Sequence, residues 1–323
     1  NGRDGSAGIH ASARREYCRR SLRTGWLIHV EFFETYPTAL FVVTGLVGLI
    51  FGSFLNVVAY RVPIMLGRAW REQCAELEAE NVPEPAHAAG KPFNLIKPNS
   101  ACSECGSAIG ARHNIPILSY ILLSGCCAQC GTKISVRYPF IEAATAILSL
   151  VVAWVFGPSW QLLLALPITW TLLALSVIDI NNKLLPDSMT LPLMWAGLLA
   201  SLFQPGGDVI FTDVSSSVIG AVAGYLSLWS VYQTFKLVTG KEGMGYGDFK
   251  LLGALGAWLG WQLLPLVIML SAAGGAVIGT AMIVLGGNSR ETPIPFGPYL
   301  AGAGWIALLW GEELTGSYLL LLG

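Results

Sequence analysis

Two cysteine pairs, separated by 21 residues, have the spacing of a metal site. They are Cys102-Ser-Glu-Cys105 and Cys127-Ala-Gln-Cys130, and a glycine follows each pair directly. Four thiolates at such a spacing typically hold Zn²⁺ in a tetrahedral structural site, which has no open position for water. The sequence therefore predicts structural zinc bound by Cys102, Cys105, Cys127 and Cys130. The alternative is two redox-active or merely buried cysteine pairs.

Two aspartates beside apolar segments are the candidates for catalysis. Asp179 ends one apolar run, and Asp248 follows alternate glycines, including Gly245 and Gly247, at the start of another. An aspartate costs about 2.5 to 3.5 kcal/mol at the centre of a membrane helix, so an acid near a span suggests a function. Two carboxylates about 3 Å apart share one proton, so one can activate water while the other protonates an amide. The pair predicts peptide hydrolysis, with Gly245 and Gly247 in the active-site loop.

Other interpretations of these acids remain open. Asp179 alone could simply mark a helix end at the water boundary. Asp187 is a weaker candidate, because an acid directly after Pro186 is typical of a turn. A glycine-rich run before a helix can also bind phosphate, but no strand precedes this one. Neither GxSxG nor HExxH occurs, which disfavours serine and zinc peptidase mechanisms.

The composition predicts that membrane helices position these residues. Hydrophobic residues make up 54% of the 323 residues and charged residues only 12%, and the mean hydropathy is +0.59. Soluble domains carry about 25% charged residues, so much of this chain must lie in a lipid bilayer. The net charge of −1 and the absence of a basic patch interleaved with aromatics exclude nucleic acid as an expected partner.

Apolar windows long enough to span a bilayer recur along the chain. They are approximately residues 38–60, 139–157, 160–179, 188–204, 214–236 and 299–322. Residues 251–287 add 37 uncharged residues, which as one helix would measure about 55 Å. We expect two short helices there, broken near Gly260, Gln262 or Pro265. The predicted fold is an all-α polytopic membrane protein with about eight transmembrane helices.

The segments divide as follows. Residues 1–33, which contain six arginines, are treated as a doubtful N-terminal extension. The first transmembrane helix is expected at 34–60, because its apolar run is longer than the roughly 7 to 15 residues of a signal-peptide core. Residues 61–138 are expected to form a zinc-binding domain, and 139–323 a transmembrane aspartic peptidase domain.

Lys and Arg in the loops predict the orientation. The segment 61–138 contains eight of them: Arg61, Arg68, Arg71, Lys91, Lys97, Arg112, Lys133 and Arg137. It should be cytoplasmic. The loops near 180–187 and 237–250 fall on the same side and carry Lys183, Lys241 and Lys250. Both aspartates should therefore face the cytoplasm.

These motifs together resemble the prepilin peptidases, or type IV leader peptidases, of the GxGD aspartic protease group. The resemblance extends from about residue 36 to near the C-terminus. Besides the cysteine pairs and the Asp248 motif, it rests on Gly52-Ser53-Phe54-Leu55-Asn56, on Arg137-Tyr138-Pro139 and on Thr292-Pro293-Ile294-Pro295-Phe296-Gly297-Pro298.

The resemblance implies an enzyme of the bacterial inner membrane with Asp179 and Asp248 as its catalytic pair. Its substrates would be type IV prepilins and type II secretion pseudopilins, cut after a basic leader that ends in glycine. It also implies methylation of the new N-terminal residue, usually phenylalanine, by S-adenosylmethionine, although the sequence contains no recognisable loop for that cofactor.

Two other classes compete with this prediction. A membrane transporter tolerates acids within the bilayer, but it predicts internal hydropathy repeats, and none is evident. A membrane thiol oxidoreductase would use the CxxC pairs and leave the aspartates without a role.

Overall fold

The computed structural model describes residues 31–79, 93–102, 104–286 and 295–322, and these residues are mostly helical. The predicted extension 1–33 thus lies almost entirely outside the described residues. Within them, β-structure is limited to two isolated bridges in the cysteine-containing loop. The longer helices are α2 (Pro37–Ala79), α4 (Arg137–Phe156), α5 (Trp160–Asn182), α6 (Asp187–Leu202), α7 (Val214–Thr239), α8 (Tyr246–Leu259), α9 (Leu264–Gly286) and α10 (Gly297–Leu322). The class, all-α, is as predicted.

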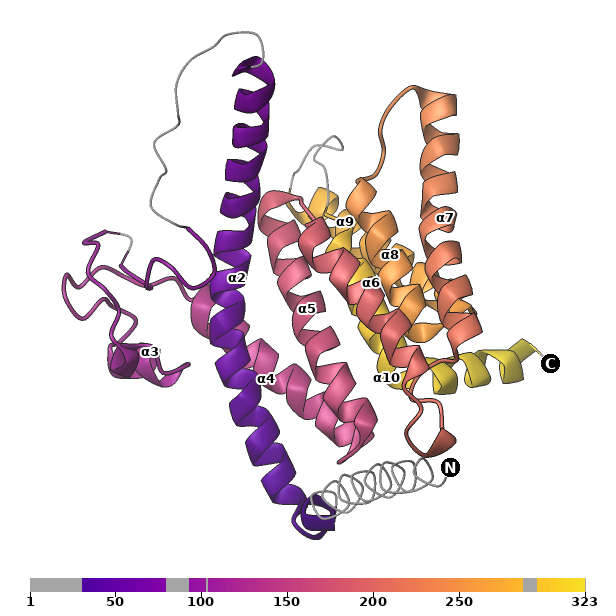
Figure 1. Ribbon diagram of the computed structural model, residues 1–323, viewed down its shortest axis with the longest axis horizontal. Helices are drawn as coiled ribbons and strands as arrows, with labels where there is room; N and C mark the ends of the chain where they lie inside the picture. The colour runs from indigo at the N-terminus through magenta and orange to yellow at the C-terminus, as the bar shows by residue number, and fades with distance from the viewer. Residues whose placement is uncertain (1–30, 80–92, 103, 287–294, 323) are drawn as a thin grey trace, which may run out of the picture.

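The helices form one bundle with a small loop region at its side (Figure 1). Helix α8 is central, because it packs against α6, α7, α9 and α10. Helices α2 and α4 pack against each other and against α5. The loop between α2 and α4 contains the cysteines and the short helix α3 (Leu118–Leu122), and it lies beside α2 in Figure 1.

Five helices of the described chain are long and apolar enough to cross a membrane. They are Pro37–Leu77, Arg137–Phe156, Trp160–Asn182, Val214–Thr239 and Trp261–Met282. Helices α6 and α8, with 16 and 14 residues, are shorter than the roughly 20 residues that a span needs. The chain is thus a multi-pass membrane protein, and the total of eight crossings remains a prediction.

The first helix is longer than expected. The transmembrane span predicted at 34–60 is part of a longer helix, because α2 contains 43 residues, passes through Pro63 and continues to Ala79. Such a helix measures about 65 Å, twice the hydrocarbon thickness of about 30 Å. Exposed charged residues such as Arg68, Arg71 and Glu72 follow Pro63, so this part of α2 projects into water. A change to charged residues therefore marks the membrane boundary here, but not the helix end.

The predicted break in the uncharged segment 251–287 is confirmed. Helix α8 ends at Leu259, and Gly260 has φ +76°, a conformation that favours glycine. A short 3₁₀ turn, Trp261–Leu263, leads into α9.

Glycines bring α7 and α8 into close contact. A Cβ atom on Gly224 would lie 2.9 Å from the backbone carbonyl carbon of Leu252. A Cβ atom on Gly220 would lie 2.9 Å from the backbone carbonyl carbon of Gly256. The spacing Gly-x-x-x-Gly is typical of membrane helices whose backbones pack directly together. This contact fixes the position of α8, which carries Asp248.

Candidate active site and metal site

The four paired cysteines converge on one point. All four Sγ atoms lie within 4.8 Å of one another, and the Sγ atoms of Cys102 and Cys130 are 3.8 Å apart. Four sulfurs at Zn–S distances of about 2.3 Å in a tetrahedron are separated by about 3.8 Å. The cluster could therefore hold a metal ion, and its all-sulfur donors are those that suit Zn²⁺.

The two CxxC turns have the same local structure. In the first, the Cys102 N–H donates to Ser107 O at 3.0 Å, and in the second the Cys127 N–H donates to Thr132 O at 2.8 Å. The glycines after the pairs, Gly106 and Gly131, have φ of +68° and +72°. Each turn therefore needs a residue that accepts positive φ, which explains the glycine that follows each pair.

Hydroxyl groups next to the cluster lower the pKa of two of its thiols. The Ser107 hydroxyl lies 3.0 Å from the Cys105 Sγ and holds the pKa of that thiol below its usual value. The Thr132 side chain has the same effect on the pKa of Cys130. Because metals bind thiolates and not thiols, both shifts favour metal binding.

Two buried charged residues attach the cysteine loop to the helices. Glu142 of α4 accepts a 2.7 Å hydrogen bond from the Ile117 N–H. Arg61 of α2 donates to Asn94 O at 2.9 Å and to Pro98 O at 2.6 Å. Both residues are less than 10% exposed, with values of 8% for Glu142 and 7% for Arg61. These bonds hold the loop to both α2 and α4.

Asp179 lies in the last turn of α5 and is 6% exposed. The helix dipole disfavours a carboxylate at this end. The structure compensates with a second helix, because α10 begins at Gly297 and the N–H of that residue donates a 2.9 Å hydrogen bond to Asp179 Oδ2. A Cβ atom on Gly297 would lie 2.7 Å from the same oxygen, so the contact requires glycine.

Asp248 is the third residue of α8 and is 7% exposed. Here the helix dipole favours a carboxylate. The preceding Gly247 is needed for close approach, since a Cβ atom there would lie 2.6 Å from Leu185 Cβ. Gly245 has φ −78° and ψ 145°, which any residue adopts. Of the two loop glycines, the packing therefore requires Gly247, whereas the backbone conformation at Gly245 does not require glycine.

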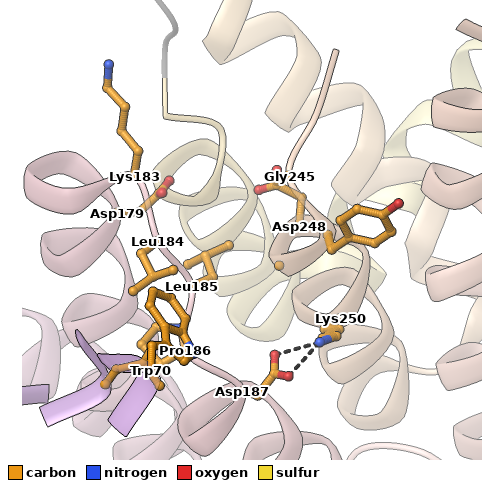
Figure 2. Close-up of a pocket in the computed structure, with 13 residues that line it drawn as sticks. Trp70, Asp179, Lys183, Leu184, Leu185, Pro186, Asp187, Gly245, Asp248 and Lys250 are labelled. Atoms are coloured by element: carbon orange, nitrogen blue, oxygen red, sulfur yellow. Dashed lines mark hydrogen bonds and ion pairs between the residues drawn. The ribbon is translucent and has the colours of Figure 1, made fainter. Parts of the chain in front are cut away.

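The structure brings both aspartates into one cavity of about 260 Å³. Asp179 enters it from α5 and Asp248 from α8 (Figure 2). Gly245 and Gly247 line the same cavity. Neither aspartate forms an ion pair within the described part of the chain, and two such buried carboxylates are costly, so their presence in one cavity points to a chemical role.

Asp187 also lines this cavity, but its carboxylate has another partner. Lys250 Nζ donates to both of its oxygens, at 2.7 and 2.6 Å (Figure 2). Its side chain is 56% exposed, unlike the two buried aspartates. Asp187 therefore forms an ion pair at the rim.

Sequence reasoning missed several residues of this site. Gly297 was recognised only as part of a motif, and its contact with Asp179 joins positions 118 residues apart. Leu185 packs against both Gly247 and Gly297. Leu66 and Trp70 of α2 line the cavity as well. Their involvement depends on the continuation of α2 beyond residue 60, which the sequence did not indicate.

Comparisons with known proteins agree with this geometry. Residues 46–156 match the bacterial peptidase A24 N-terminal domain, and residues 166–280 match the type IV leader peptidase family. The chain is 52% identical over 290 residues to a prepilin leader peptidase/N-methyltransferase of Stutzerimonas stutzeri, covering 90% of this chain and 97% of the relative. Proteins of the same name from Pseudomonas aeruginosa and Legionella pneumophila are 51% and 43% identical, covering 91% and 88% of this chain and 98% and 96% of theirs. No solved structure matches. The chain belongs to the type IV leader peptidase family.

Proposed function

We propose that this chain is a membrane aspartic endopeptidase that cleaves the leader peptide from type IV prepilins, with Asp179 and Asp248 as its catalytic pair. The observation that carries the proposal is the presence of these two buried carboxylates in a single cavity. The name of the relatives, prepilin leader peptidase/N-methyltransferase, supports the reaction and the substrate class.

The two carboxylates divide the acid and base steps between them. Buried carboxylates that lie close together share one proton, so one is ionised and the other protonated. The ionised carboxylate takes a proton from water as the water oxygen attacks the scissile carbonyl carbon. The protonated carboxylate gives its proton to the amide nitrogen as the C–N bond breaks. The products are the leader carboxyl group and a new amino terminus.

We assign the catalytic cavity to the cytoplasmic face of the bacterial inner membrane. The Lys and Arg residues of 61–138, together with Lys183 and Lys241, support this orientation. A basic leader stays on that side while the apolar segment after it enters the bilayer, so the bond between them is presented at the interface. We include the pseudopilins of type II secretion as substrates, because they too would present a basic leader followed by an apolar segment. A protease site inserted after Asp208 should be cut from outside in spheroplasts, and one inserted after Lys241 should be protected.

The cysteine loop is assigned a structural role. Zn²⁺ bound by Cys102, Cys105, Cys127 and Cys130 would stabilise residues 61–138 as a cytoplasmic domain, beside the transmembrane peptidase domain of 139–323. The meeting of all four sulfurs within 4.8 Å favours one metal over two separate redox pairs. The four cysteines do not line the cavity of Asp179 and Asp248, so zinc is assigned no part in the cleavage step.

The name of the relatives also supports N-methylation of the new amino terminus. S-adenosylmethionine would supply the methyl group. This second activity rests on those names alone, and no residue of the chain is assigned to it. It is tested by transfer of a labelled methyl group to the cleaved product, compared with uncleaved prepilin as the control.

One experiment tests the proposed peptidase. Purified protein in detergent is incubated with a prepilin, and the products are identified by mass spectrometry. We expect a single cut by the wild-type protein, none by Asp179→Asn, and cleavage by the control Asp187→Asn. Absence of cleavage by the wild-type protein, or full cleavage by Asp179→Asn, would sink the proposal.

A further inference from the structure

A largely apolar run of nine residues, from Ile115 to Leu123, lies in the cysteine loop between the two CxxC pairs. It contains no charged residue, and it contributes neither to the cluster of four cysteines nor to the catalytic cavity. The run is too short to cross a bilayer, which takes at least about 17 residues. In a loop between two membrane helices, such a run is expected to be buried in the protein or covered by something else.

The structure does not bury this run in the protein. Its middle forms the short helix α3, in which the side chains of Leu118, Ile121 and Leu122 are 49%, 66% and 72% exposed. The buried residue of α3 is Ser119, with only 8% of its surface exposed. Helix α3 thus turns a polar residue inward and its large apolar side chains outward, which is the reverse of what water favours.

Contacts on the inner side of α3 fix this orientation. Ile117, directly before the helix, has φ +58°, which is costly for a β-branched residue. Its N–H donates the 2.7 Å hydrogen bond to the buried Glu142, and such strain persists only where surrounding contacts hold it. After the helix, Gly125 packs closely on Tyr120, since a Cβ atom there would lie 2.9 Å from the Tyr120 ring. The outward apolar face is therefore a fixed part of the fold.

Figure 1 places α3 at the level of the transmembrane helices. Helices α2 and α5 run from bottom to top in this view, and α3 lies at the height of α4, well below the upper end of α2 that projects into water. Helix α4 is a candidate span whose Phe140 and Ile147 side chains are 70% and 59% exposed. Exposed apolar side chains on a span contact lipid tails, which are as apolar as leucine. The apolar face of α3 therefore lies at the depth of a lipid-facing helix surface.

The charges on either side of the run fit the surface of a bilayer. Arg112 and Lys133 flank the uncharged residues 114–132, and both are exposed. No Asp or Glu occurs between Gly106 and Ile141. Basic residues beside an inserted apolar segment attract anionic lipid headgroups. A lipid surface thus accounts for both the apolar centre and the basic flanks.

We propose that α3 is a lipid-binding helix. Leu118, Ile121 and Leu122 enter the bilayer leaflet at which α4 begins, and Arg112 and Lys133 contact its anionic headgroups. The partner is a lipid surface and not a second protein, because α3 lies at the depth of the transmembrane helices. This role goes beyond the proposed peptidase activity and does not depend on it. Its consequence is that the cysteine loop is held against the membrane.

The test places a fluorescent amino acid at Ile121, Phe140 or Leu77, one position at a time. These side chains are similarly exposed, at 66%, 70% and 68%. The whole chain is reconstituted into vesicles of phosphatidylethanolamine and phosphatidylglycerol that carry a nitroxide near the headgroup end of an acyl chain. Leu77 lies on the part of α2 that projects into water and is the negative control, whereas Phe140 on α4 is the positive control. We expect quenching at Ile121 to approach that at Phe140 and to exceed that at Leu77 at least about threefold, because interfacial helices bury their apolar face at this depth.

A second variant tests the apolar face itself. Leu122→Asp places a charge at an exposed position of α3, away from the inner contacts of Ile117 and Ser119. Quenching at Ile121 should then fall at least about twofold, because a charge opposes entry into lipid, whereas Leu122→Ala should change it little. The comparison is repeated with the fluorescent residue at Leu118, so that it does not depend on the folding of one variant.

Two results would overturn the inference. One is quenching at Ile121 and Leu118 no greater than at Leu77, which would leave a protein partner as the cover of α3. The other is quenching at Ile121 that Leu122→Asp does not reduce.

Discussion

The N–H of Gly297 donates a 2.9 Å hydrogen bond to Oδ2 of Asp179, although 118 residues separate the two along the chain. Through this bond, the N-terminus of α10 meets the C-terminus of α5 at the catalytic cavity. The positive end of one helix dipole thus stabilises a carboxylate that its own helix disfavours. The position of Asp179 therefore depends on a segment far from it in the sequence.

Gly297→Ala should strongly reduce cleavage. The added Cβ atom would lie 2.7 Å from Asp179 Oδ2, so the carboxylate must shift. A displacement of about 1 Å at a reacting group can lower the rate about 100-fold, and we expect a loss of that order in kcat. Gly302→Ala is the matched control on α10, because a Cβ atom there has no neighbour within 4 Å. Similar activity of the two variants would contradict the assigned role of Gly297.

The two glycines of the active-site loop should respond differently to alanine. At Gly247 the new Cβ atom would lie 2.6 Å from Leu185 Cβ, which forces the start of α8 and Asp248 to move. At Gly245 it would lie 3.6 Å from Asp248 Oδ2, an ordinary contact distance. We expect Gly247→Ala to lose at least about tenfold more activity than Gly245→Ala. The reverse order, measured on one prepilin under identical conditions, would show that close packing on Leu185 is not what the loop requires.

Much of the fold was predictable because it follows from local properties. Runs of apolar residues predicted α4, α5 and α7 to within a few residues. The break at Gly260 was predictable as well, since 37 uncharged residues are too many for one span. The aspartates were recognisable because an acid beside a membrane span is energetically costly. The cysteines were recognisable because two CxxC pairs have the spacing of a metal site. In each case the signal lay within a short stretch of sequence.

What was not predictable depends on contacts between distant segments. The bond from Gly297 to Asp179 and the packing of Leu185 on Gly247 appear only once the helices are assembled. The continuation of α2 beyond residue 60 was not predicted, because charged residues after Pro63 resemble a loop, whereas a helix can continue into water. Trp70 lies on this continuation, so its place in the cavity was not predicted either.

Protein purified under reducing conditions should contain about one zinc ion per chain, since one closed four-thiolate site is predicted. Cys102→Ser should lose the metal and make the cysteine loop more sensitive to limited proteolysis. Cys74→Ser should keep it, because Cys74 is exposed on α2 and is not part of the cluster. Metal analysis checks both variants. A zinc content near zero in the wild-type protein would favour the redox interpretation instead.

The cap of α7 should make stability depend on pH. Asp213 accepts hydrogen bonds from the Ser215 hydroxyl at 2.5 Å and from the Ser215 and Ser216 N–H groups at 2.9 and 3.1 Å, and these hold its pKa well below the usual value. Because the pKa is lowered in the folded state, the stabilisation is complete above the unfolded pKa of about 3.9 and is lost as pH falls below it. Asp213→Ala should therefore lower the melting temperature by a few degrees at pH 7 and by less at pH 3.

Asp213→Asn is the control for this effect. It keeps an oxygen that can accept the hydrogen bonds, so its melting temperature at pH 7 should lie between those of wild type and Asp213→Ala. A difference between Asp213→Ala and wild type that is as large at pH 3 as at pH 7 would rule out the ionised cap as the cause.

The joint action of Asp179 and Asp248 is tested most directly by the prepilin cleavage rates of Asp179→Asn, Asp248→Asn and the double variant, measured at saturating enzyme. Each single variant should lose at least about 10³-fold, and the double variant should lose no more than either single one, because two groups that act as a unit are not additive. Retention of more than about a tenth of the wild-type rate by either single variant would contradict the dyad, as would losses that multiply in the double variant.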